Sequence, residues 1–144
     1  MIQSVAFIGL GAMGYRMAAH LPQHFDTVYV WNRNFEKAKQ HATEFGTQAV
    51  ELEQAVQADI IFSCLPTSKE VEELIGTVKN KCYALLVDCP IGFKKKKKNL
   101  AMQLKLQNVD FLDAPVSGQT IGAETGTLTV MIGGEATAFE KALP

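Results

Sequence analysis

The feature that most constrains this chain is a glycine-rich stretch close to its N-terminus. A short apolar run, residues 5–8, leads directly into the pattern Gly9-x-Gly11-x-x-Gly14. The residues that follow have helical periodicity, and one face of that helix carries Met13, Met17, Ala18 and Leu21. Strand, glycine turn and helix start is the order that a dinucleotide-binding βαβ unit requires. The sequence therefore predicts a nucleotide-binding turn at residues 9–14.

The three glycines have separate physical roles in such a turn. Gly9 lets the chain leave the strand sharply, because glycine adopts unusual backbone angles at little steric cost. Gly11 leaves room for backbone N–H groups to approach a pyrophosphate, and Gly14 lets the helix pack closely on the sheet. The N-terminus of the helix adds free N–H donors and a positive dipole. The alternative is an ordinary glycine-rich turn that binds nothing.

Composition restricts the broad class of the protein. The 144 residues suit one domain, 1–144, and 47% of them are hydrophobic with a net charge of −1. This charge gives no general attraction to nucleic acid, and the apolar runs are too short to span a bilayer. The N-terminus has no basic region ahead of its apolar run, so we expect no signal peptide and a cytoplasmic location.

Neither the cysteines nor the histidines have the spacing of a metal site. The three cysteines fit a reducing compartment and small buried positions: Cys64, Cys82 and Cys89. The three histidines are scattered over predicted helices and loops, and we interpret them as surface residues: His20, His24 and His41. We therefore expect no metal.

Strand and helix patterns alternate along the whole chain. Strands are predicted at residues 5–8, 27–31, 47–50, 60–65, 83–88, 109–114 and 128–132. Helices are predicted at 12–21, 35–45, 52–58, 67–76, 93–106 and 135–143, with a loop at 115–126. Asn34 is expected to cap the second helix and Gly46 to end it. This alternation predicts an α/β, Rossmann-type, doubly wound and mostly parallel sheet with helices on both faces.

The end of the second strand indicates which dinucleotide binds. In NAD-binding versions an Asp or Glu at this point hydrogen-bonds the ribose hydroxyls. This chain has Asn32-Arg33 instead. A carboxylate would repel a 2′-phosphate, whereas Arg33 can pair with it. We predict NADP as the cofactor, with NAD as the second choice; the alternative is that Arg33 is only a solvated charge at a strand end.

The distinctive loops all follow strands, so they should meet along one edge of the sheet, where open α/β sheets bind ligands. They are residues 9–14, 32–33, 65–67, 88–92 and 115–118.

Several motifs resemble the β-hydroxyacid dehydrogenase family, which includes 3-hydroxyisobutyrate and 6-phosphogluconate dehydrogenases. They are Gly9-Leu10-Gly11-Ala12-Met13-Gly14, Cys64-Leu65-Pro66-Thr67-Ser68, Asp113-Ala114-Pro115-Val116-Ser117-Gly118, Gly122-Ala123-x-x-Gly126-Thr127-Leu128 and Met131-Ile132-Gly133-Gly134. The resemblance covers nearly the whole chain, but only the N-terminal, cofactor-binding part of a typical member. It implies reversible oxidation of a short hydroxy acid with NAD or NADP; with the choice of NADP made above, we expect hydride transfer between NADP(H) and a small hydroxy acid or semialdehyde.

The resemblance also implies roles for individual residues. The cofactor would be lined by Gly9, Leu10, Gly11, Ala12, Met13, Gly14, Asn32, Arg33, Leu65 and Pro66. The substrate, a small carboxylate-bearing molecule, would meet Ser117, Gly118 and Gln119. A hydroxyl and a backbone N–H suit that task because they donate to an anion without adding charge. Ser117 could instead be a turn residue that bonds its own backbone.

The chain departs from the family pattern in three places. The family's catalytic lysine lies on a later helix, beyond Pro144, so we expect no catalytic residue in this chain and no turnover by it alone. We likewise expect the helical domain that would complete the substrate pocket and form a homo-oligomer to lie outside these residues. The stretch Cys89-Pro90-Ile91-Gly92 is apolar where the family has Ser-Thr, and Gln119 replaces a glycine.

A run of five lysines, Lys94 to Lys98, has no role in this scheme. We interpret it as a solvated helix face rather than a nucleic-acid patch, because no aromatic residues are interleaved with it.

Two other functions are compatible with the glycine turn. One is a non-catalytic dinucleotide-binding or scaffold module of the same fold, and the other is an imine reductase-like enzyme.

Overall fold

The protein forms an α/β sheet with the Rossmann strand order. The structure is a computed structural model that describes residues 2–66, 70, 73, 76, 85–89, 94–106 and 109–142. A seven-stranded sheet has the order β3-β2-β1-β4-β5-β6-β9, in which only the last pair is antiparallel. Its strands are β1 (Ser4–Ile8), β2 (Thr27–Trp31), β3 (Gln48–Ala49), β4 (Ile60–Ser63), β5 (Leu85–Asp88), β6 (Asp110–Asp113) and β9 (Gly133–Gly134). The predicted fold class is confirmed.

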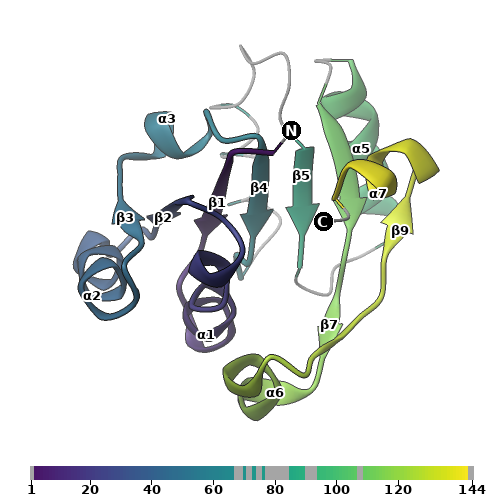
Figure 1. Cartoon of the computed structure of the whole chain (residues 1–144). Helices are drawn as coiled ribbons and strands as arrows, with labels where there is room; N and C mark the ends of the chain where they lie inside the picture. Colours follow the sequence, from purple (N-terminus) through teal and green to yellow (C-terminus); the bar gives the residue numbers. More distant parts are fainter. Residues whose placement is uncertain are drawn as a thin grey trace.

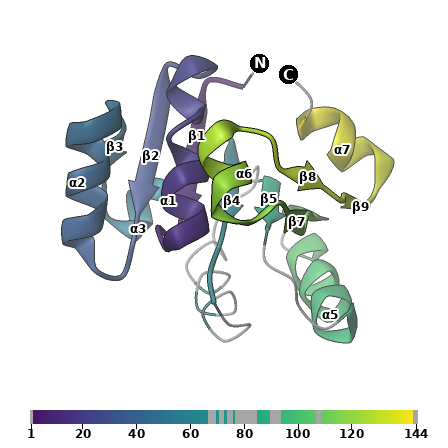
Figure 2. The same ribbon diagram turned by 90° about the horizontal axis from the view of Figure 1, so that it is seen from below.

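Helices cover both faces of this sheet (Figure 1). They are α1 (Ala12–Ala18), α2 (Phe35–Phe45), α3 (Leu52–Ala55), α5 (Lys94–Lys105), α6 (Gln119–Thr125) and α7 (Ala136–Ala142). One core cluster joins α3 and α5 to alternate residues of β1 and β4, such as Ala6 and Ile61. The intervening residues, such as Val5 and Phe7, face α1, α2 and α7. Figure 2 shows α5 and α7 on opposite sides of the sheet. Period-two alternation in buried strands therefore builds two apolar layers.

The parallel strands end in a single row. Ile8 pairs with Trp31 of β2 and with Ser63 of β4. Ser63 pairs with Asp88, and Asp88 pairs with Asp113. The segments that leave β1, β2, β4, β5 and β6 therefore start from the same edge, as the sequence predicts. The arrowheads of β1, β4 and β5 in Figure 1 point toward that edge.

The region after β6 differs from the prediction. The expected loop at 115–126 contains a strand, β7 (Val116–Ser117), and the helix α6. The predicted strand at 128–132 is only β8 (Thr129–Val130), which pairs with β7 in a separate two-stranded sheet. The glycines of this region suggested a loop, since glycine disfavours helices. Packing overrides that preference, because Gly122 and Ala123 are buried where α6 meets α1.

Smaller differences concern helix ends. α1 ends at Ala18; Ala19 and His20 form a turn, and a 3-10 helix, Leu21–Gln23, then contains Pro22. Asn34 occupies the N-cap of α2, but its side chain makes no capping bond; Gly46 ends α2 in the left-handed conformation, as predicted. Residues 70, 73 and 76 of the helix predicted at 67–76 are helical, whereas residues 67–69 lie outside the described residues. Within the described part of the chain, no helix could cross a membrane.

Some of the cysteines and lysines discussed above lie among the described residues. Cys89 is buried and Cys64 half-buried, while Cys82 and residues 90–92 lie outside the described residues. The lysine run begins α5, and its last member, Lys98, is exposed.

The interpretation of His41 as a surface residue is wrong. Its side chain is 0% exposed, beneath Tyr15 and Phe45. Nε2 lies 2.9 Å from the Tyr15 carbonyl and Nδ1 lies 2.8 Å from Oγ1 of buried Thr47. A carbonyl only accepts, so Nε2 carries the proton and the Thr47 hydroxyl donates to Nδ1. These two hydrogen bonds offset the cost of burying a neutral imidazole. The sequence does not reveal them, because His41 stands alone there.

Burial of His41 predicts a loss of stability below neutral pH. Desolvation lowers its pKa below the ordinary value of 6.5. Because the unfolded chain then takes up a proton more readily than the folded one, the stabilisation is complete above pH 6.5. It falls at lower pH, toward the folded pKa, by at most about 1.4 kcal/mol per pH unit.

Urea unfolding at pH 7.5 and pH 5.5 measures this effect. The His41→Gln variant should lose less stability between the two pH values than the wild type. The matched variant at an exposed histidine, His24→Gln, should keep the wild-type loss. Equal losses in all three proteins would contradict the assignment to His41.

Candidate nucleotide-binding site

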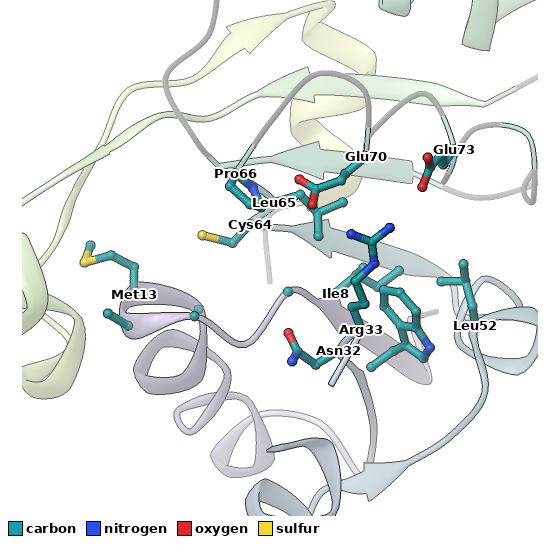
Figure 3. A pocket seen from close by; sticks show the side chains of 15 residues that line it. Ile8, Met13, Asn32, Arg33, Leu52, Cys64, Leu65, Pro66, Glu70 and Glu73 are labelled. Carbon is teal, nitrogen blue, oxygen red and sulfur yellow. The ribbon is translucent and has the colours of Figure 1, made fainter. Parts of the chain in front are cut away.

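A cavity of about 460 Å³ opens at the carboxyl edge of the sheet, where the ends of β1, β2 and β4 meet (Figure 3). It is lined by Ile8, Gly9, Gly11, Ala12, Met13, Gly14, Trp31, Asn32, Arg33, Leu52, Cys64, Leu65, Pro66, Glu70 and Glu73. Figure 3 shows Met13 and Leu52 at opposite ends of the cavity. Loops that are far apart in the sequence thus form one elongated pocket.

Gly9 starts the turn under tight steric constraint. Its φ of +96° lies in the region that favours glycine, and its N–H donates to the Trp31 carbonyl at 3.0 Å. A Cβ at this position would lie 2.3 Å from the carbonyl oxygen of Cys64. The predicted sharp exit from β1 is therefore present, and only a residue without a side chain allows it.

Gly14 and Gly11 have opposite surroundings. A Cβ on Gly14 would lie 2.0 Å from the carbonyl oxygen of Gly9, so this glycine provides the close packing of helix on strand that the sequence predicts. A Cβ on Gly11 would meet nothing within 4 Å. Gly11 is exposed and lines the cavity, so it leaves open the space that a ligand would use.

Asn32 links the end of β2 to the glycine turn. Its Oδ1 accepts the Leu10 N–H at 2.9 Å, and its Nδ2 donates to the Asn34 carbonyl at 3.1 Å. Lys37, in the first turn of α2, donates from Nζ to the Leu10 carbonyl at 3.4 Å. The amide of Asn32 therefore holds the backbone of the turn.

Leu10 is the one predicted cofactor residue that does not line the cavity. Its side chain is 0% exposed and packs in the core with Phe7 and Ala18. Only its backbone reaches the site, through the bonds to Asn32 and Lys37. Strand alternation would place Leu10 on the same face as Ile8, but the positive φ of Gly9 interrupts the extended backbone, and Leu10 packs with Phe7 on the other face of the sheet.

Sequence reasoning missed several lining residues, namely Ile8, Trp31, Leu52, Cys64, Glu70 and Glu73. Ile8, Trp31 and Cys64 stand at the ends of strands, directly before or within the predicted ligand loops, so their positions were a usable signal. Glu70 and Glu73 are three residues apart and helical, a spacing that puts both on one helix face. No motif marked that face as a wall of the cavity.

The proposed substrate residues lie outside the cavity. Ser117, Gly118 and Gln119 are all exposed, and none is among the lining residues. They lead into α6, which packs against α1, and Nε2 of His20 in the α1 region lies 2.7 Å from the Ala123 carbonyl. Gln119 adopts a φ of +57°, an uncommon conformation for a residue with a side chain.

No group of three or more His, Cys, Asp or Glu residues is arranged for a metal ion in the part of the chain that the structure describes.

Comparisons with known proteins agree with the fold. Residues 4–144 match the model of the NAD binding domain of 6-phosphogluconate dehydrogenase. The chain is 40% identical to 2-(hydroxymethyl)glutarate dehydrogenase of Eubacterium barkeri, over 97% of this chain and 48% of the relative. Mycobacterium tuberculosis 3-hydroxyisobutyrate dehydrogenase, solved with L-serine, superposes with a TM-score of 0.89 at 27% identity, over 100% of this chain and 50% of that one.

Both dinucleotides occur among similar proteins, one as a named requirement and one as a bound molecule. The NAD-dependent L-serine dehydrogenase of Pseudomonas aeruginosa is 35% identical, over 99% of this chain and 50% of the relative. Psf3, solved with NADP+, has a TM-score of 0.83 at 27% identity, over 95% of this chain and 51% of that one. Solved imine reductases at 22–24% identity share the fold alone. The chain spans about half the length of the curated relatives it matches.

Proposed function

This chain belongs to the family of the NAD binding domain of 6-phosphogluconate dehydrogenase, and from that premise we propose that it is the NADP-binding part of a hydroxyacid dehydrogenase. The observation that supports the choice of NADP is the end of β2. Arg33 lines the cavity there, and the neighbouring Asn32 brings an amide rather than a carboxylate. A guanidinium pairs with a 2′-phosphate, whereas a carboxylate at that position would favour a free hydroxyl.

The pyrophosphate of the dinucleotide would lie against the turn at residues 9–14. The first amides of α1 have no acceptor within the helix, and Gly11 leaves them accessible. Leu65 and Pro66 would bound the cavity toward the nicotinamide. When bound, the cofactor would supply or accept the hydride, and the residues of this chain would bind and orient it.

The rest of the reaction is proposed from the relatives. The substrate would be a small hydroxy acid or semialdehyde whose carboxylate meets Ser117 and Gly118. Hydride transfer to a carbonyl also needs a proton donor, and we expect a lysine outside these 144 residues in that role. The 144-residue chain would then bind the cofactor without turning it over, and the complete protein would be a cytoplasmic homo-oligomer.

Gln119 supports a second candidate, a non-catalytic nucleotide-binding module. The family pattern has glycine at this position, and the backbone here keeps a positive φ despite the side chain. A bulky residue beside Ser117 and Gly118 would restrict access of a carboxylate. Assaying the complete protein with NADP(H) and a panel of hydroxy acids and semialdehydes separates the two candidates, since only the enzyme oxidises or reduces a member of the panel.

Nucleotide titration tests the proposed cofactor. Trp31 is the only tryptophan and lines the cavity, so quenching of its fluorescence reports binding. We expect NADP+ to bind about tenfold more tightly than NAD+, because a charge-assisted pair adds on the order of 1.5 kcal/mol. Arg33→Gln should remove this difference, while Arg16→Gln, at an arginine outside the cavity, should keep it. Equal or tighter binding of NAD+ by the wild type would contradict the NADP assignment.

A further inference from the structure

Two carboxylates stand on the wall of the cavity that faces Arg33. Glu70 is half-buried, Glu73 is exposed, and both belong to the helical residues that follow β4. They line the same cavity as Arg33. Figure 3 shows the guanidinium of Arg33 directed toward the side of the cavity on which both glutamates lie.

The charge of this end of the cavity is therefore not simply basic. Among the described lining residues, only Arg33, Glu70 and Glu73 carry a formal charge. Their charges sum to −1. A phosphate monoester carries about −1.5 to −2 at neutral pH. From these three described side chains, a 2′-phosphate placed beside Arg33 would meet one attraction and two repulsions.

We propose that Glu70 and Glu73 are specificity-determining residues that oppose a 2′-phosphate and so limit the preference for NADP that Arg33 creates. The inference rests on the proposed function, because it concerns the nucleotide in that cavity. NAD+ has a neutral 2′-hydroxyl, which carboxylates repel far less and to which they can accept a hydrogen bond. The two glutamates thus act on the 2′ position, where the two dinucleotides differ, rather than on the rest of the molecule, which NAD+ and NADP+ share.

Exposure sets the relative strength of the two residues. The field of Glu73 is screened by water and by salt, whose Debye length is about 10 Å at 0.1 M. Glu70 is half-buried, so its field is screened less and it should have the larger effect. The predicted order of influence on the choice of nucleotide is therefore Glu70 before Glu73.

Binding of NADP+ and NAD+ to the wild type, Glu70→Gln, Glu73→Gln and the double variant tests the proposal. Glutamine keeps the size of the side chain and removes its charge. We expect the ratio of Kd for NAD+ to Kd for NADP+ to rise about threefold to tenfold in Glu70→Gln, less in Glu73→Gln, and most in the double variant. Glu53→Gln, at an exposed glutamate of α3 outside the cavity, should leave the ratio unchanged.

The possible results separate this inference from the proposed function. If both nucleotides bind the wild type and the ratio stays constant in every variant, the inference is overturned and the proposed function stands. If the variants weaken both nucleotides equally, the glutamates hold the shared adenosine part, which also overturns it. If neither nucleotide binds the wild type, the proposed function fails and the inference fails with it. Thermal unfolding of each variant checks that a changed ratio comes from a folded protein.

Discussion

Replacing Gly14 with alanine should lower the free energy of unfolding by about 3 kcal/mol or more and abolish nucleotide binding. The new Cβ would lie 2.0 Å from the Gly9 carbonyl oxygen and 3.1 Å from Cε1 of Phe7. The turn cannot move away, because Gly9 is itself packed against the Cys64 carbonyl and bonded to Trp31. Either α1 lifts from the sheet or the turn opens, and both changes deform the cavity.

Gly11→Ala is the matched control. Its Cβ would meet nothing within 4 Å, and its φ of −72° is acceptable to alanine. Its stability should stay within about 1 kcal/mol of the wild type, since alanine is only a poorer N-cap than glycine. Nucleotide affinity should nevertheless fall, because the methyl group occupies the approach to the turn. Urea unfolding and the Trp31 titration measure both effects, and a Gly14→Ala protein with the wild-type unfolding midpoint would disprove this account of the turn.

Asn32→Ala should weaken binding of NADP+ and NAD+ by about tenfold or more and destabilise the protein by about 1–3 kcal/mol. The variant leaves the Leu10 N–H without its acceptor and removes the bond to the Asn34 carbonyl. The turn then loses the side chain that holds its backbone at the end of β2. Both dinucleotides share the pyrophosphate that this turn would bind, so both should be affected alike.

Asn32→Asp and Asn34→Ala distinguish the role of this amide. Aspartate keeps an oxygen for the Leu10 N–H, so stability should largely return, but its charge should weaken NADP+ more than NAD+. Asn34→Ala should leave the stability and both affinities close to wild type, because the Asn34 side chain makes no capping bond. Wild-type affinity of Asn32→Ala for both nucleotides would show that the link between Asn32 and Leu10 does not position the site.

Local patterns in the sequence predicted the parts of the fold that local physics controls. Runs of apolar, β-branched and aromatic residues mark β1, β2 and β4, because the central strands of a sheet that helices cover on both faces have little choice of composition. The local patterns failed after β6, where the glycines suggested a loop and α6 forms instead. Gly122 is a poor helix residue by itself, but it is buried in α6, which packs against α1. The contact with α1, a segment distant in the sequence, is not visible in the local pattern.

The residues of the candidate site likewise fall into those that local sequence signals predict and those that depend on tertiary contacts. Nine of the ten predicted cofactor residues line the cavity, since a glycine turn and strand ends are local signals whose meeting point follows from parallel topology. The role of Leu10 toward the cofactor stays a prediction; its side chain lies in the core, and its backbone belongs to the turn. The prediction for His41 was wrong, because its partners, the Tyr15 carbonyl and Thr47, become neighbours only when α1 and α2 pack together.

By itself, the sequence determined the alternation of strands and helices as far as β6, the glycine turn at residues 9–14, and the family to which the chain belongs. These depend on residue type and spacing along the chain. Only the tertiary structure decided that the Asn32 amide holds the turn, that His41 is buried, and that Glu70 and Glu73 share a cavity with Arg33. Burial, hydrogen bonding and electrostatic interaction depend on distance in space, and the fold alone brings these residues within range.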